Sequence, residues 1–208
     1  SCNLAEILAV AISFLLYLPS PLLPLQILFL NLVTDVFPAL ALGVGKGERQ
    51  IMDDPPRKSN EPLMTGRLWA MTTLYWIVMT LAVIAVCYFA QAHLRLEPDK
   101  VNNLGFYTLV FTQLLNVFNT PLRNRSFFRN KVVSNPWVWT ALAICILIMV
   151  AAYFIPFSRQ ALSLVPLSWT HFKWVLIFGF LALLLTQILK RLVFAPSLRK
   201  NCNRDSVG

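Results

Sequence analysis

Long runs without a single charged residue are the feature that most limits how this chain can fold. Leu68 to Ala92 is such a run, and two more extend from Val138 to Ile155 and from Trp174 to Leu189. A helix that crosses the ~30 Å apolar core of a bilayer needs about 20 such residues. Because 57% of all residues are hydrophobic and only 13% are charged, the sequence predicts an all-α, polytopic membrane helix bundle.

Prolines and polar stretches divide the apolar sequence into about six expected transmembrane helices. Pro19 and Pro21 place a tight turn after the first helix, because proline cannot continue a helix interior. The predicted helices cover residues 1–18, 22–44, 68–92, 104–120, 136–155 and 172–194, within one membrane domain over residues 1–195. Since the chain opens inside an apolar segment, we expect this domain to be part of a longer protein.

Basic residues give the chain a net charge of +9, and they gather in alternate connections between the predicted helices. The segments 45–67, 122–135 and 196–208 hold most of them, whereas the turn at residues 19–21 holds none. Lys and Arg are enriched in the cytoplasmic loops of membrane proteins. We therefore expect these three segments to be cytoplasmic, and we interpret the charge as a topology signal rather than a nucleic-acid-binding surface.

Asp35 lies in the middle of the second predicted helix, far from either end of its apolar stretch. Carboxylates inside a membrane usually face a protein interior and bind an ion or a basic partner. None of the predicted helices carries a basic residue near its middle, which favours ion binding over an ion pair. Asn31, Thr34 and Asp35 are spaced i, i+3, i+4, which places their side chains on one helix face.

Glu6 is the matching acid on the first predicted helix, and Asn3 lies one turn before it. Glu6 precedes Ser20 by about as many residues as Asp35 follows it, so both carboxylates lie about 21–22 Å from the turn at ~1.5 Å per residue. Two acids at one depth on adjacent helices would repel each other without a cation between them. We expect them to form two walls of one site.

The fourth predicted helix is the most polar, and Gln113 and Asn116 could present amide oxygens at mid-depth. Amides of this kind can also simply tie helices together, and both interpretations stay open for Gln113. All the candidate ligands are oxygens, which favours a hard cation such as calcium, sodium, potassium or magnesium. Pro38 should free a backbone carbonyl near Thr34, and broken helices are a common way to build an ion site at mid-membrane.

Soft-metal chemistry has little support in the sequence. The cysteines at positions 2, 87, 145 and 202 are scattered without ligand spacing, and those in apolar stretches are expected to pack as small hydrophobic residues. His93 and His171 fall in the connections expected on the outer side of the membrane, where we interpret them as solvated surface residues.

Three motifs resemble type II P-type cation-transporting ATPases, and in particular the sarco/endoplasmic reticulum and bacterial calcium pumps. They are "NLVTD" at residues 31–35, "PALALG" at 38–43 and "IMDDPPR" at 51–57, which are similar to the sixth transmembrane helix of those pumps and its following loop. Residues 1–7, 111–119 and 185–192 resemble their fifth, eighth and tenth helices. The resemblance implies helices five to ten, with the front half of the fifth missing.

The resemblance also implies roles for individual residues. The positions that match cation ligands of the family are Asn3, Glu6, Asn31, Thr34, Asp35 and Gln113. Gln113 stands where the calcium pumps have a glutamate, which lowers the negative charge of the implied site and leaves the number and charge of the ions open. Asp53, Asp54 and Arg57 match a loop that contacts the phosphorylation domain, and a solvated connector is the alternative for each of them.

No "DKTG" phosphorylation motif and no phosphate-binding loop occurs in these 208 residues. The resemblance therefore places ATP and Mg²⁺ in missing domains of a longer parent chain, together with the missing N-terminal helices. Three functions remain as alternatives: the membrane part of an ATP-driven pump, most simply for Ca²⁺ in a bacterial plasma membrane; a passive or secondary carrier of sodium, potassium or protons; and a structural multi-span protein.

Overall fold

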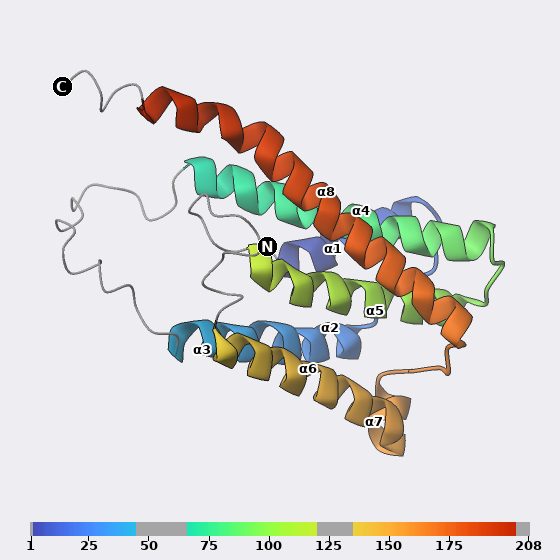
Figure 1. Ribbon diagram of the computed structural model, residues 1–208. Coiled ribbons are helices and arrows are strands. Elements are labelled where there is room, and N and C mark those ends of the chain that lie inside the picture. Colours follow the sequence, from blue (N-terminus) through green and yellow to red (C-terminus); the bar gives the residue numbers. More distant parts are fainter. Residues whose placement is uncertain (1, 45–65, 120–134, 203–208) are drawn as a thin grey trace.

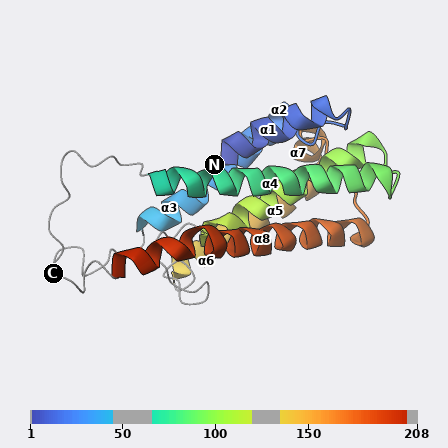
Figure 2. The same cartoon turned by 90° about the horizontal axis from the view of Figure 1, so that it is seen from above.

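The computed structural model describes residues 2–44, 66–119 and 135–202, and every regular element in these ranges is helical. The chain passes back and forth along a bundle of helices, as Figures 1 and 2 show from two directions. This confirms the predicted all-α membrane helix bundle. Most of the expected cytoplasmic loops, with Asp53, Asp54 and Arg57, lie outside the described residues.

The first helix is α1 (Cys2–Leu15), which is shorter than the predicted helix. Tyr17 adopts a left-handed conformation with φ of 55°, and two backbone bonds close the helix end. Leu18 N–H donates to Ser13 O at 2.9 Å, and Tyr17 N–H donates to Phe14 O at 3.2 Å. This is a Schellman motif, which ends α1 three residues before the predicted boundary although no glycine is present.

The second predicted helix is one rod made of three parts. It comprises α2 (Pro24–Leu30), the π-helix η1 (Asn31–Val36) and α3 (Phe37–Val44). Pro38 has no N–H for the carbonyl four residues earlier, so a regular α-helix cannot continue through this region. The prediction of a locally broken helix is confirmed, and it takes the form of a wide turn of the kind often found at functional sites.

The most polar helix, α5 (Pro98–Asn116), lies in the interior of the bundle and is followed by the short 3₁₀ turn η3 (Val117–Asn119). It packs against α4 (Gly66–Ala92) and α8 (Trp169–Cys202). The helix begins six residues before the predicted start at Leu104, so that boundary was wrong. Pro98 in the first turn and Asp99 beside the helix dipole explain the early start.

The remaining helices are α6 (Pro136–Phe154) and the short α7 (Pro156–Ala161). Sequence reasoning did not predict α7, which occupies the connection between α6 and α8. The last helix also differs from the prediction: α8 begins at Trp169 and continues to Cys202, whereas the predicted helix covers residues 172–194. The helical backbone therefore extends into the segment that we expected to be a separate tail.

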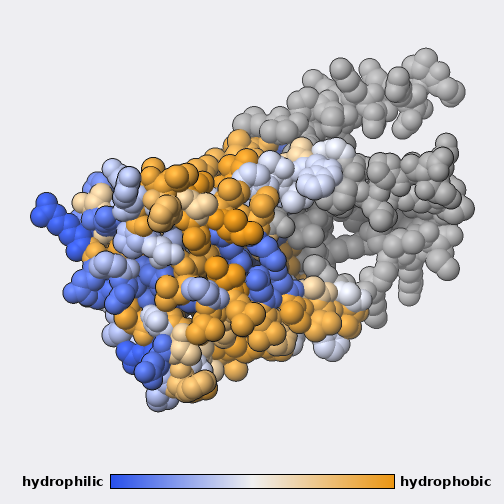
Figure 3. Space-filling model, turned by 180° about the vertical axis from the view of Figure 1, so that it is seen from behind, coloured by the Kyte–Doolittle hydropathy of each residue, from blue (hydrophilic) through white to orange (hydrophobic). Residues whose placement is uncertain are grey.

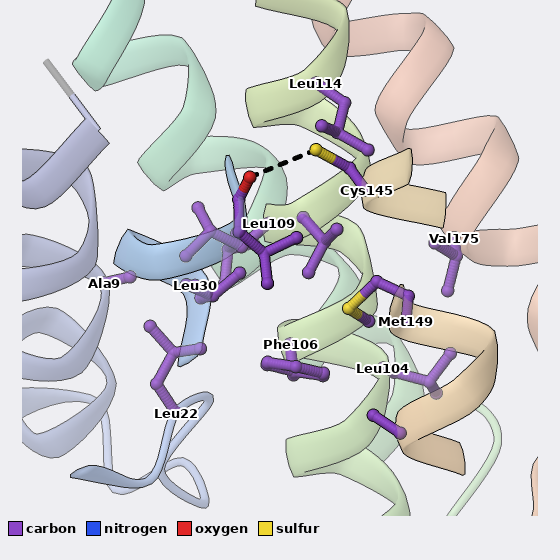
Figure 4. Close-up of a cluster of buried hydrophobic side chains, with 14 of the residues drawn as sticks. Ala9, Leu22, Leu30, Leu104, Phe106, Leu109, Leu114, Cys145, Met149 and Val175 are labelled. Carbon is purple, nitrogen blue, oxygen red and sulfur yellow. Dashed lines mark hydrogen bonds between the residues drawn. The ribbon is translucent and has the colours of Figure 1, made fainter. Parts of the chain in front are cut away.

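Among the described residues, four segments are long and apolar enough to cross a membrane: Pro24–Ala41, Leu68–Ala92, Pro136–Phe154 and Trp169–Lys190. The α1 helix is apolar but shorter, and α5 is shielded by its neighbours. Figure 4 shows the apolar core, in which Phe106 of α5 lies among side chains from the surrounding helices. Hydrophobic residues also cover much of the outer surface in Figure 3, as expected where helices face lipid.

Candidate functional site

Gln113 joins three elements at the centre of the predicted cation site. Its Nε2 donates a hydrogen bond to Glu6 Oε1 at 2.9 Å, and its Oε1 accepts one from the Thr34 hydroxyl at 2.7 Å. These bonds connect α5 to α1 and to the π-helix η1. The structure therefore brings together three residues that are far apart in the sequence and that we predicted as ligands.

Glu6 is almost completely buried, with 2% of its surface exposed, although α1 is a peripheral helix. The buried face of α1 consists of Ala5, Glu6, Ala9 and Ser13, and this face packs against α4. A carboxylate in such surroundings needs hydrogen-bond donors or a cation, because removing a charge from water is expensive. The Gln113 amide supplies one such donor.

Asp35 is half-buried in η1, one residue after Thr34. Its charge acts on Glu6, so the two acids lie within electrostatic reach of each other. The Cys2 side chain is a hydrogen-bond partner of Asp35. The expectation that Glu6 and Asp35 share one region is consistent with this arrangement, in which like charges repel more strongly than they would in water.

Asn31 begins the π-helix, one turn before Asp35. Its Oδ1 atom is buried and has no hydrogen-bond partner among the described residues. Leaving a buried acceptor unsatisfied costs about 1–3 kcal/mol. An unsatisfied oxygen of this kind, one turn from Asp35 in the same π-helix, suits a cation better than it suits an apolar core.

Asn3 does not join this group in the described part of the chain. Its side chain is exposed, whereas Glu6 one turn later is buried. The i, i+3 spacing placed both on one side of the helix, but the edge of the buried face passes between them. Asn3 therefore remains a predicted ligand on sequence grounds alone.

Cys145 makes a contact with the π-helix that sequence reasoning missed. Its thiol on α6 donates to the carbonyl oxygen of Val33 at 3.1 Å, the bond drawn as a dashed line in Figure 4. The π-helix and Pro38 disturb the backbone hydrogen bonds here, and the thiol satisfies a carbonyl next to Thr34. We expected this cysteine to pack as a small hydrophobic residue, and it is indeed fully buried.

A second polar cluster, at the end of the bundle near α7, was also missed. Gln26 Nε2 donates to Asn102 Oδ1 and to Leu162 O, both at 2.9 Å, and Asn102 Nδ2 donates to Ser20 O at 3.0 Å. Gln26 is fully buried, and its position in an apolar stretch was a signal that could have been used. All these bonds are satisfied within the protein, so the cluster fastens the ends of α2 and α5 together.

The available ligand atoms limit which metal the cluster around Gln113 could hold. Among the residues that the structure describes, no group of three or more His, Cys, Asp and Glu side chains is placed to hold a metal ion. Ligands beyond Glu6 and Asp35 would have to be amide, hydroxyl or backbone oxygens. Oxygen donors of this kind suit Ca²⁺, which takes six to eight of them.

Comparison with known proteins identifies relatives over most of the chain. The family model described as "Cation transporting ATPase, C-terminus" matches residues 19–192. "Calcium-transporting ATPase 1" of Bacillus cereus is 28% identical over 204 residues, covering 91% of this chain and 23% of that protein. "Calcium-transporting ATPase" of Bacillus subtilis is 31% identical over 173 residues, covering 80% of this chain and 19% of that protein.

A plant relative covers the same share of this chain as the Bacillus cereus protein does. "Calcium-transporting ATPase 3, endoplasmic reticulum-type" of Arabidopsis thaliana is 26% identical over 217 residues, covering 91% of this chain and 22% of that protein. The chain thus spans about a fifth of the length of the curated relatives it matches.

Proposed function

Because this chain belongs to the family of cation-transporting ATPase C-terminal regions, we propose that it supplies half of the ion pathway of an ATP-driven Ca²⁺ pump. The observation that carries this proposal is the Gln113 bridge between Glu6 and Thr34, beside Asp35 and the unsatisfied oxygen of Asn31. The names of the relatives support Ca²⁺ as the ion.

The proposed ligands are the oxygens of Glu6, Asn31, Thr34, Asp35 and Gln113. Two carboxylates neutralise the charge of one Ca²⁺, and the neutral oxygens complete part of its shell. Gln113 has a double role in this scheme, because its amide nitrogen satisfies Glu6 while its oxygen faces Thr34. On binding, the cation would replace the amide nitrogen as the partner of Glu6.

ATP hydrolysis and Mg²⁺ binding belong, in this proposal, to other parts of the parent protein. The basic segments 45–67, 122–135 and 196–208 would face the cytoplasm, where the first of them could contact a phosphorylated domain. The parent pump would then reside in a bacterial plasma membrane or a eukaryotic internal membrane, since the relatives include both kinds of organism.

The test uses the full-length parent protein in sealed vesicles, with ATP-dependent Ca²⁺ uptake as the measurement. Asp35→Asn and Glu6→Gln should each raise the Ca²⁺ concentration for half-maximal uptake at least about tenfold, equivalent to about 1.4 kcal/mol. Glu97→Gln is the matched control, because Glu97 is an exposed acid at the N-terminal end of α5.

Two results would contradict the proposal. Uptake that proceeds equally well without ATP would indicate a passive or secondary carrier. Unchanged Ca²⁺ dependence in Asp35→Asn would show that the polar cluster only holds helices together. Competition with sodium, potassium and magnesium in the same vesicles identifies the ion.

A further inference from the structure

An apolar groove lies between α6 and α8, on a side of the bundle that the proposed cation site does not use. The α6 helix packs against α3 and η1, whereas α8 packs against α4 and α5. The space between them has a volume of about 600 Å³. Its walls are aliphatic and aromatic, with Phe111 of α5, Met149 and Val150 of α6, and Val175 of α8 among them.

The groove has a defined end near α7. Tyr153, Phe154, Trp169 and Phe172 line it there, and Trp169 is the first residue of α8. Figure 1 shows α7 and the start of α8 at the same end of the bundle. Since Trp and Tyr gather where a membrane meets water, this end lies at the level of the lipid head groups.

A polar hollow of about 450 Å³ adjoins the groove at this end. Phe154 and Val165 line both spaces, so the two are direct neighbours. Asp99, Arg159, Gln160 and Ser163 also line the hollow. An apolar groove beside a charged hollow near the membrane surface is complementary to an amphiphilic molecule, which has an apolar chain and a charged head group.

Arg159 is held in place by an aromatic ring and a backbone carbonyl rather than by an acidic side chain. Its guanidinium lies 5.4 Å from the centre of the Tyr153 ring, and its Nε donates to Leu164 O at 3.2 Å. The described residues include no ion-pair partner for Arg159. Its terminal amino groups therefore remain for an anionic oxygen, and guanidinium groups bind phosphate well.

The backbone around the hollow is also fixed. Ser163 adopts a left-handed conformation with φ of 51°, and Leu164 N–H donates to Arg159 O at 2.9 Å. The buried Asn103 of α5 donates to Ser163 O at 3.0 Å and accepts from Val165 N–H at 3.2 Å. The hollow is thus built from a constrained turn that is tied to the central helix.

We propose that the groove and the hollow together bind one zwitterionic phospholipid, with an acyl chain in the α6–α8 groove, its phosphate on Arg159 and its ammonium facing Asp99. The charge pattern determines the choice of occupant. Arg159, which has no ion-pair partner among the described residues, and the exposed Asp99 line one hollow beside the apolar groove. A transmembrane helix of another protein would fill the groove but leave the hollow unoccupied.

The experiment uses full-length protein in lipid nanodiscs that contain a phosphatidylethanolamine with a photoreactive acyl chain. Cross-linked peptides are then mapped by mass spectrometry. We expect labelling to concentrate on the parts of α6 and α8 that line the groove. Val150→Trp should lower this labelling about tenfold by filling the groove, whereas Leu147→Trp should not, because Leu147 is exposed on α6 outside the groove.

The head-group contact is tested with a second matched pair. Arg159→Gln should lower labelling by phosphatidylethanolamine about tenfold, since a charge-assisted bond to phosphate is lost. Lys173→Gln removes an exposed cation near the same end, over the Trp174 ring, and should leave labelling unchanged. A photoreactive fatty acid without phosphate should label weakly and should not respond to Arg159→Gln.

Several results would overturn the proposal. Equal effects of Arg159→Gln and Lys173→Gln would show only general attraction to the membrane surface. Equal labelling by the fatty acid would show that no head group is recognised. Undiminished labelling in Val150→Trp, in protein that elutes as a single folded species, would place the lipid elsewhere. Because the measurement is lipid labelling, its failure leaves the proposed transport function untouched.

Discussion

Replacing Gln113 with glutamate tests whether this side chain faces a bound cation. In the present structure the Gln113 amide lies 2.9 Å from Glu6 and 2.7 Å from Thr34, so a carboxylate at this position would be close to the proposed ion. At a separation of about 4 Å and an effective dielectric constant of about 20, each pair of unit charges interacts by about 4 kcal/mol. A divalent ion would gain about twice as much attraction as a monovalent one.

Most of that attraction is offset in the variant. The new carboxylate loses hydration and repels Glu6, and each effect costs several kcal/mol. We therefore expect a net gain of about 1.4–2.8 kcal/mol, or a ten- to hundredfold lower Ca²⁺ concentration for half-maximal uptake. Sodium should gain less than Ca²⁺, so the selectivity for Ca²⁺ should rise as well.

The assay is ATP-dependent uptake by the full-length protein, with calcium titrated against a constant sodium background. Gln91→Glu is the matched control, because Gln91 is exposed near the C-terminal end of α4. Gln113→Leu removes both hydrogen bonds and should weaken Ca²⁺ binding. If Gln113→Glu leaves the ion dependence unchanged, the amide serves only to connect α1, α5 and η1, and the reasoning about its role is wrong.

Three further changes test packing and hydrogen bonding in the helix bundle. Cys145→Ala removes the donor to Val33 O and should lower Ca²⁺ affinity severalfold, whereas Cys145→Ser keeps a donor and should restore it in the uptake assay. Gly105→Ala should destabilise the protein by about 1–3 kcal/mol in thermal unfolding, because the added Cβ atom would lie 2.9 Å from the Cys87 sulfur. Gly43→Ala is the control, because a Cβ atom added there would have no neighbouring atom within 4 Å. Gln26→Leu should lower the unfolding temperature without changing ion dependence, because it breaks a cluster away from the site. Hydrogen bonds between membrane helices contribute about 0.6 kcal/mol on average and at most about 1.7 kcal/mol.

Patterns of apolar residues were sufficient to predict the helices, because each membrane helix leaves a long uncharged segment in the sequence. Boundaries were less predictable, since local backbone bonds decide them. The Schellman motif at Tyr17 shortens α1, and Pro98 lets α5 begin within a polar stretch. The short helix α7 has too few residues to show a periodic pattern.

The candidate site was predictable where polar residues interrupt apolar segments. Glu6, Thr34 and Gln113 stand out for this reason, and in the structure Gln113 is hydrogen-bonded to both of the others. The exposure of Asn3 could not be foreseen, because spacing along one helix does not reveal where its buried face ends. The bond from Cys145 to Val33 O was not predictable either, since the accepting atom belongs to the backbone and has no sequence signature.

The wide turn at residues 31–36 has a geometric consequence for everything that follows it in the rod. One additional residue in a helix rotates the next segment by about 100° around the axis. The α2 and α3 portions are therefore out of phase with each other, and a single uninterrupted helix with the same residues would turn a different side of α3 toward α6. Asn31, Thr34 and Asp35 occupy the stretch where this change of phase takes place, so the deletion of one residue there would redirect half of the rod.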